Sequence, residues 1–250
     1  MKKLAIALLL ACFALPAQAA DHTNLEENLP TELEDAYTIG YRGREIQGIV
    51  RYIEEGEGQS RWVYQPVLEV GIFRNTQLNV AGTFYSGNAD RKGSGDVSSE
   101  VLYNFNTESL WLPATALAVK GEFPTGKESN GVDVTTKVIL SKMPFLRTTL
   151  HHRLHANLIW KHNSGRDEEK ERSDMFKGII GFSVRAGKDS NFIVDYIREQ
   201  KMEKDKDANV LEAGFRRQMT PFTVLSIGAG AGIGEDSENY RITFGFQHAF

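Results

Sequence analysis

Cysteine is almost absent from this chain of 250 residues, and the only one, Cys12, lies near the start. Lys2 and Lys3 precede an apolar run over 4–15 and the small-x-small site at 17–19, which together are typical of a secretory signal. We therefore expect a signal peptide at 1–19 and a mature chain from Ala20. Such a chain excludes disulfides and cysteine-ligated metals. Residues 9–12 also resemble a lipid-attachment box, although Leu10 and Phe13 fit that box poorly.

Long hydrophobic runs and excess basic charge are also missing. No segment after the signal offers the roughly 20 apolar residues that a spanning helix needs. Without Lys2 and Lys3 the chain keeps 27 basic and 33 acidic residues, a net charge of −6. No nucleic-acid partner is expected, because such proteins concentrate basic charge on one surface. Nothing after residue 45 resembles a low-complexity linker, so one structural unit is predicted.

Residues 20–44 are acidic, carry Pro30 and show no regular alternation of apolar and polar residues. This composition favours a periplasmic N-terminal arm. The alternative is a small plug or partner-binding helix over Leu25 to Tyr37, although its capping and periodicity are weak.

After Arg44 the dominant sequence period is two, which is typical of strands whose faces meet different solvents. In 148–162, for example, Leu154, Leu158 and Trp160 fall on one face, while Arg153 and Lys161 fall on the other. The same rule gives twelve strands, an even number as in single-chain outer-membrane barrels. Their expected ranges are 45–55, 61–73, 77–87, 97–106, 113–123, 132–142, 148–162, 175–187, 191–201, 208–219, 222–232 and 239–250. The fold class is therefore all-β, a closed antiparallel transmembrane barrel over 45–250.

The last strand separates this barrel from a soluble sheet. Its outward face ends in Phe246 and Phe250, and an exposed apolar edge of this kind would aggregate in water. A terminal Phe in this pattern resembles the signal read by the barrel-assembly machinery of outer membranes. Interfacial girdles are expected from the aromatic residues near strand ends. These residues are Trp62, Tyr64, Phe105, Trp111, Trp160 and Phe250.

The inward positions carry charges of both signs, which must be paired or hydrated. We expect ladders that join Lys177 or Arg185 to Asp195 or Glu199. The whole predicted lumen-lining set is His151, Arg153, His155, Lys177, Arg185, Asp195, Glu199, Glu212, Arg216 and Arg241. Smaller inward residues, among them Ala81, Ala114 and Gly228, suggest that any open passage follows their side of the barrel.

Four segments resemble one known family in their order and spacing: Arg74–Leu78, Gly93–Asp96, Leu102–Phe105 and Phe123–Lys127. The family consists of outer-membrane barrels associated with the meta-pathway of phenol degradation, often called transporters. The resemblance covers roughly 45–162. It implies passage of small hydrophobic or aromatic compounds and supplies no catalytic residues. Asp96 and Lys127 lie on the expected outer loops and could pair there, a role in loop architecture that we favour over ligand contact.

An enzymatic alternative rests on His162-Asn163-Ser164. It resembles the His-x-Ser element of outer-membrane phospholipase A, in which His acts as base to a Ser nucleophile. No orienting Asn is evident on the next strand. A metal site is not expected, because His151 and His155 would lie about 13 Å apart along a strand. The glycine-rich 228–234 lacks the following helix of a nucleotide loop.

The sequence thus predicts a monomeric, porin-like barrel, exported through the periplasm to a bacterial outer membrane, without cofactor. Its expected partners are outer-membrane lipids, the assembly machinery and small hydrophobic or aromatic molecules. A lipid hydrolase and a purely structural or surface barrel remain the alternatives.

Overall fold

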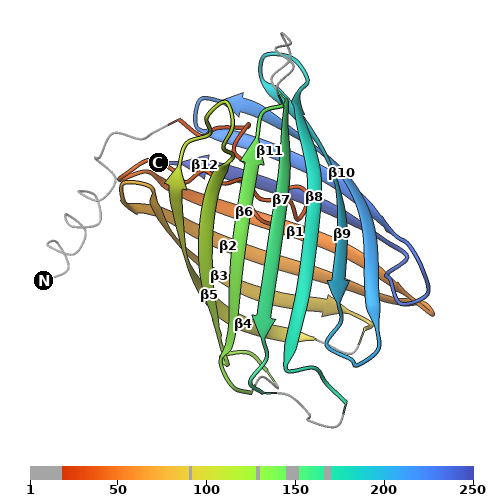
Figure 1. The fold of residues 1–250 in the computed structure, drawn as a ribbon. Helices are drawn as coiled ribbons and strands as arrows, with labels where there is room; N and C mark the ends of the chain where they lie inside the picture. The colour runs from red at the N-terminus through yellow and green to blue at the C-terminus, as the bar shows by residue number, and fades with distance from the viewer. Residues whose placement is uncertain (1–18, 90–91, 128–129, 145–151, 166–169) are drawn as a thin grey trace, which may run out of the picture.

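The computed structural model describes residues 19–89, 92–127, 130–144, 152–165 and 170–250, and these form a closed barrel (Figure 1). Each strand pairs antiparallel with its sequence neighbours, and β1 pairs with β12. The strands are β1 (Arg44–Gly56), β2 (Gln59–Phe73), β3 (Thr76–Gly87), β4 (Gly93–Asn106), β5 (Ala114–Phe123), β6 (Asp133–Lys142), β7 (His152–His162), β8 (Asp174–Arg185), β9 (Ser190–Gln200), β10 (Asp207–Thr220), β11 (Thr223–Gly232) and β12 (Tyr240–Ala249). The predicted fold class and the twelve strands are confirmed. Residues 148–151 of the expected seventh strand lie outside the described residues.

Closure of the barrel removes the sheet edge that the last strand would otherwise expose. The β1/β12 ladder runs from Glu45↔Ala249 to Glu54↔Tyr240, and the amide of Phe250 donates to the carbonyl of Arg44. On its other side β12 pairs with β11. All backbone groups of these strands can therefore be satisfied within the sheet, as a non-aqueous environment requires.

The outer surface is apolar because alternate residues of every strand point away from the lumen. Leu158 and Ile180 are each 63% exposed, and Phe176 is 60% exposed. Trp62, Phe105, Trp111 and Trp160 are also exposed, as expected of interfacial aromatics. Among the described residues, no helix is long and apolar enough to cross a membrane.

The two ends of the barrel differ in their connections. The terminal end holds the start of β1, the end of β12 and short turns such as 74–75 and 221–222. The loop end holds the longer connections 124–132, 163–173 and 233–239. Among the connections that the structure describes in full, two break this pattern: residues 57–58 form a short turn at the loop end, and 107–113 form a longer one at the terminal end.

Most of residues 19–43, called here the lumenal segment, lie inside the barrel, whereas Gly40, Tyr41 and Arg42 are exposed at the terminal end (Figure 1). The amide of Ala20 bonds the carbonyl of Pro221 at the terminal end, and Arg42 bonds Gly71 at the same end. Between these points the chain enters the lumen and returns. The periplasmic arm expected at 20–44 is therefore corrected to a segment within the lumen. It forms turns and bends, not the helix considered over Leu25 to Tyr37.

Candidate functional site, the filled lumen

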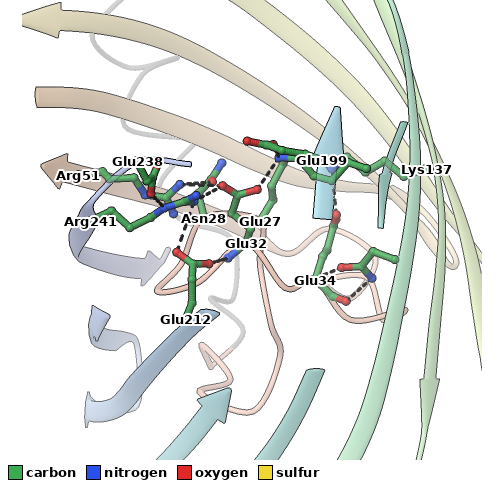
Figure 2. A network of polar contacts seen from close by, with 12 residues as sticks. Glu27, Asn28, Glu32, Glu34, Arg51, Lys137, Glu199, Glu212, Glu238 and Arg241 are labelled. Atoms are coloured by element: carbon green, nitrogen blue, oxygen red, sulfur yellow. Dashed lines mark hydrogen bonds and ion pairs between the residues drawn. The ribbon is translucent and has the colours of Figure 1, made fainter. Parts of the chain in front are cut away.

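Glu32 connects the lumenal segment to three cations of the barrel wall (Figure 2). Its carboxylate lies 3.3 Å from the Arg51 guanidinium and 2.5 Å from Lys177 Nζ, and it also pairs with Arg241. Its backbone amide donates to Glu212 at 2.8 Å. Charged groups of a wall and a segment thus neutralise one another, which offsets the cost of removing them from water.

Lys137 on β6 forms the second charged junction and is 1% exposed. Its Nζ lies 3.0 Å from Glu27, 2.9 Å from Glu34 and 2.8 Å from Glu100. Two of these carboxylates belong to the lumenal segment and the third belongs to β4. One ammonium group therefore holds three carboxylates in place, and Lys120 binds Glu27 from the neighbouring strand at 2.9 Å.

Wall side chains also satisfy backbone groups of the lumenal segment. Asn157 accepts from the Glu34 amide at 2.9 Å and donates to the Glu34 carbonyl at 2.8 Å. The amide of Ala36 donates to Ser141 Oγ at 3.0 Å, and the amide of Ile39 donates to Gln77 at 2.8 Å. A segment without secondary structure needs such partners when buried, because unpaired backbone groups are costly.

Apolar contacts complete the packing on the side of β4 to β10. Leu25 and Leu33 join wall residues in one buried cluster, and Ala36 joins another. The wall members of these clusters are Ile179, Ile193, Ile197 and Val210 in the first, and Leu102, Ala114, Ala116, Ala118 and Ile139 in the second. The small-residue side that the sequence suggested as a passage is therefore covered by the lumenal segment at β5.

Glycines of the wall allow the lumenal segment to approach closely. A Cβ atom at Gly214 would collide with the Pro30 ring, and one at Gly245 would collide with the Leu29 side chain. Both glycines lie at inward positions of their strands, Gly214 between Glu212 and Arg216 and Gly245 between Thr243 and Gln247. Close approach, not backbone flexibility, is what requires glycine here.

The described residues of the predicted lumen-lining set lie at inward positions, and the structure shows the partners of most of them. Lys177 pairs with Glu199 at 2.8 Å, one of the expected ladders. Arg185 instead donates to the carbonyl of Lys188, and Arg153 lies over the Tyr37 ring, 4.7 Å from its centroid. His155 hydrogen-bonds Ser141 and Ser183, each at 2.9 Å. His151 lies outside the described residues.

Further buried charges belong to β9, β10 and β12. Arg216 is fully buried and donates to the backbone carbonyls of Asn24 and Leu29 and to Gln247. Arg241 pairs with Glu212 at 3.4 Å and with Glu238. Asp195 is 1% exposed. These residues fill the lumen and do not line an aqueous bore.

Arg51, Lys137 and Glu100 were missed as site residues, although the alternation of their strands places them inward. The lumenal contacts of Glu27, Glu32 and Glu34 were missed as well. A usable signal was present: an acidic segment precedes strands whose inward positions carry Lys and Arg. Opposite charges in two such regions favour their contact inside a barrel.

His162 and Ser164 do not form a hydrogen-bonded base and nucleophile pair. The His162 ring bonds Asp174 at 3.0 Å, whereas the Ser164 hydroxyl donates to the Val132 carbonyl at 2.8 Å. The Ser164 amide donates to Asp133 at 3.1 Å, so this serine closes a loop. Within the described residues, no three His, Cys, Asp or Glu side chains are grouped to hold a metal ion.

Asp96 lies near the start of β4 and not on the expected outer loop, and it accepts from the Gly126 amide of the connection 124–132 at 3.0 Å. The Lys127 amide donates to the Ser94 carbonyl at 2.9 Å. Asp96 and Lys127 thus both take part in loop architecture, and an ion pair between them stays a prediction. Phe246 is exposed on the outer face, and its role with Phe250 as an assembly signal stays a prediction too.

Cavities remain at both ends of the barrel. The vestibule, a cavity of about 450 Å³ at the loop end, is lined by polar groups including Tyr85, Lys120 and Lys161. Below it, a small inner cavity of about 30 Å³ lies beside Glu69 and Glu100. Two cavities of about 340 and 370 Å³ lie at the terminal end. They share no lining residue with the vestibule or the inner cavity, because the lumenal segment lies between them.

Comparisons with solved structures give the barrel a fold likeness. The COG4313 outer membrane channel from Pseudomonas putida F1 matches with a TM-score of 0.65 at 11% identity, over 86% of this chain and 98% of that one. The NanC porin matches with a TM-score of 0.57 at 14% identity, over 82% and 98%. A KdgM porin in complex with disordered oligogalacturonate matches with a TM-score of 0.55 at 12% identity, over 82% and 99%.

No protein-family model and no curated protein matches the sequence. At these identities the likeness establishes the fold, a barrel of the kind found in outer-membrane channels and porins.

Proposed function

We propose that this chain is a passive channel of a bacterial outer membrane that admits small hydrophobic or aromatic molecules. The exposed apolar outer face and the closed ladder suit a bilayer and would be unsuited to water. The fold likeness to channels and porins supports the same location. In this setting the terminal end faces the periplasm, and the loop end faces outward.

The observation that carries this proposal is the filled lumen. Glu32 and Lys137 fix the lumenal segment across the barrel, so the broad bore needed for unselective passage of ions and water is occupied. A barrel that encloses a folded segment of its own, held by polar contacts without covalent bonds, suits controlled admission of selected molecules. A purely structural barrel would need no cavities at both ends.

The charge arrangement disfavours a cargo of acidic sugars. Lys137, Lys177 and Arg241 are each already paired with carboxylates, so they offer no continuous cationic track. The hydrophobic or aromatic class is supported by the resemblance of the segments in 45–162. It is also supported by an apolar groove on the outer wall, described below.

The expected partners follow from the same surface. Outer-membrane lipids would cover the apolar belt, and the assembly machinery would read the final strand with Phe246 and Phe250. Because each strand is paired on both sides, the barrel needs no second copy to satisfy an edge, which agrees with a monomer.

The test is flux through purified protein in vesicles whose outer leaflet contains lipopolysaccharide, which slows direct entry of apolar dyes. Naphthalene derivatives should enter faster than into protein-free vesicles, while chloride and potassium currents stay small. The variants His162→Ala and Ser164→Ala should leave both rates unchanged. Absence of flux for every compound, together with phospholipid breakdown that the Ser164→Ala change abolishes, would favour the lipid hydrolase instead.

A further inference from the structure

An apolar groove crosses the outer face of β12, β1, β2 and β3. Its volume is about 840 Å³, which falls in the range of small-molecule sites. Its lining includes Gly48 and Pro66 together with Tyr64, Leu68, Phe244 and Phe246, and the Phe246 ring covers Gly48. Gly48 and Pro66 are register partners, so two residues with little or no outward side chain meet at one point of the wall. The wall is therefore thin at Pro66, whereas the Phe246 ring fills the space outside Gly48.

The backbone ladder beneath this groove is interrupted. Pairing between β2 and β3 runs to Tyr64↔Phe84 and resumes at Val67↔Ala81, so the two intervening positions of each strand are unpaired. Pro66 has no amide to donate. On the other side of β3, the ladder with β4 shifts register between Gly82 and Phe84. Fewer hydrogen bonds hold the strands together here than along the continuous ladders, which lowers the cost of a local opening.

The lumen reaches the inner side of the same interruption. Gln65 lines the outer groove, the vestibule and the inner cavity, and Val67 lines the outer groove and the inner cavity. Thr83, opposite Gln65 by continuation of the register, lines the vestibule. One layer of small or flexible side chains thus separates the vestibule from the bilayer.

From this juxtaposition we infer that small apolar molecules leave the vestibule sideways, between β2 and β3 at Gln65 and Thr83, and enter the bilayer through the outer groove. The inference rests on the proposed function and names its route and substrate class. The path straight down would carry an apolar molecule past Glu27, Lys137 and Glu100. Separating those ion pairs leaves buried charges unpaired, whereas the groove offers an apolar surface.

The occupant assigned to the outer groove is the transported molecule itself, an apolar or monoaromatic compound. The continuity of groove and vestibule through Gln65 supports this assignment, because a depression made only for lipid would have no lumenal side. Gln65 also accepts a long contact of 3.5 Å from Asn28 of the lumenal segment, so its side chain lies between the route and the charged lumen.

Accessibility of single cysteines in the protein without residues 1–19 tests the route. Gln65→Cys should react with a charged thiosulfonate from the water and with pyrene maleimide dissolved in the bilayer. Ser98→Cys, which lines the vestibule and the inner cavity but not the groove, should react only from the water. Leu68→Cys, which lines the groove, should react only from the bilayer. Failure of Gln65→Cys to react from the bilayer would overturn the inference.

A disulfide between Gln65→Cys and Thr83→Cys tests transport. Oxidation should reduce dye entry to the rate of protein-free vesicles, and reduction should restore it. The control pair, Phe182→Cys with Val194→Cys, joins partners in an uninterrupted ladder and should change nothing. Undiminished entry with the disulfide formed would overturn the lateral route and leave the channel proposal standing. If the unaltered protein gives no entry above protein-free vesicles, the channel proposal itself fails.

Discussion

Two arcs of the wall use small residues in opposite ways. On the packed arc, β4 to β11, residues such as Ala116 and Gly214 let the lumenal segment lie directly against the sheet. On the open arc, β1 to β3, the short ring of Pro66 leaves the outer face of the wall thin, and cavities remain beside it. A small side chain in the wall therefore helps to close the lumen only where a second element fills the space beside it, and elsewhere it leaves the wall thin.

Lys137→Ala should weaken the contact between the lumenal segment and the packed arc more than any other single change considered. The change leaves Glu27, Glu34 and Glu100 without their shared cation, and loss of one partner of a buried pair costs about 3–5 kcal/mol. We expect a lower free energy of unfolding in urea, followed by tryptophan fluorescence in vesicles, and a larger ion conductance. Lys161→Ala is the control, since Lys161 is partly exposed and its pairs should contribute about 1 kcal/mol or less. Equal losses of unfolding free energy in the two variants would contradict the role of Lys137 in holding the lumenal segment.

Leu33→Ala tests the apolar half of the same contact. Leu33 is 1% exposed and packs in the cluster with Ile179 and Ile193, so its truncation should cost about 2–4 kcal/mol. Unlike Lys137→Ala, this change removes no charged group. A matched truncation at Leu158, which faces outward and is 63% exposed, should have a much smaller effect in vesicles. The measurement is again urea unfolding, and an unchanged midpoint for Leu33→Ala would show that the cluster is not maintained.

Gly214→Val tests whether glycine is needed at this position so that the lumenal segment can lie close to the wall. A Cβ at position 214 would collide with the Pro30 ring, so the lumenal segment should shift and ion conductance should rise. The overpacking should lower the free energy of unfolding by about 1–3 kcal/mol. Gly178→Val is the control, because a Cβ there meets nothing within 4 Å. Single-channel recording distinguishes the two. If both variants conduct alike, Gly214 does not set the distance between segment and wall.

The strands were predictable because alternation is a local property. The polarity of the adjacent residues is enough to place Leu158, Phe176 and Ile180 on the outward face of their strands. All three are exposed as expected. The last strand was equally clear, since its aromatic face continues to the final residue. Loop and strand bounds therefore agree closely with the sequence-based ranges.

The position of the lumenal segment could not be predicted in the same way. Its residues have no period, and their partners lie far away in sequence: Glu34 meets Lys137 and Asn157, and Glu32 meets Arg241. Such contacts are set by barrel closure, which brings inward residues of all strands around one axis. The contact of Ser164 was unpredictable for a related reason, because its hydroxyl donates to the carbonyl of Val132, a residue outside the His-x-Ser element.

Glu69→Gln changes a buried carboxyl group of the open arc. We expect it to have the smallest effect on the free energy of unfolding, and to raise that free energy where the other variants lower it. Glu69 is 2% exposed, and within the described residues its Oε2 has no hydrogen-bond partner and its carboxylate forms no ion pair with a Lys or Arg. A neutral amide of similar shape replaces a buried carboxyl group that has no cation beside it. The free energy of unfolding should therefore stay the same or rise by about 1 kcal/mol. Urea unfolding of Glu69→Gln and Lys137→Ala in the same vesicles compares how strongly the two arcs depend on their buried charged side chains. A loss for Glu69→Gln comparable to that of Lys137→Ala would mean that both arcs hold their charges equally tightly, and the thin wall at Gln65 would then lie in a rigid part of the barrel.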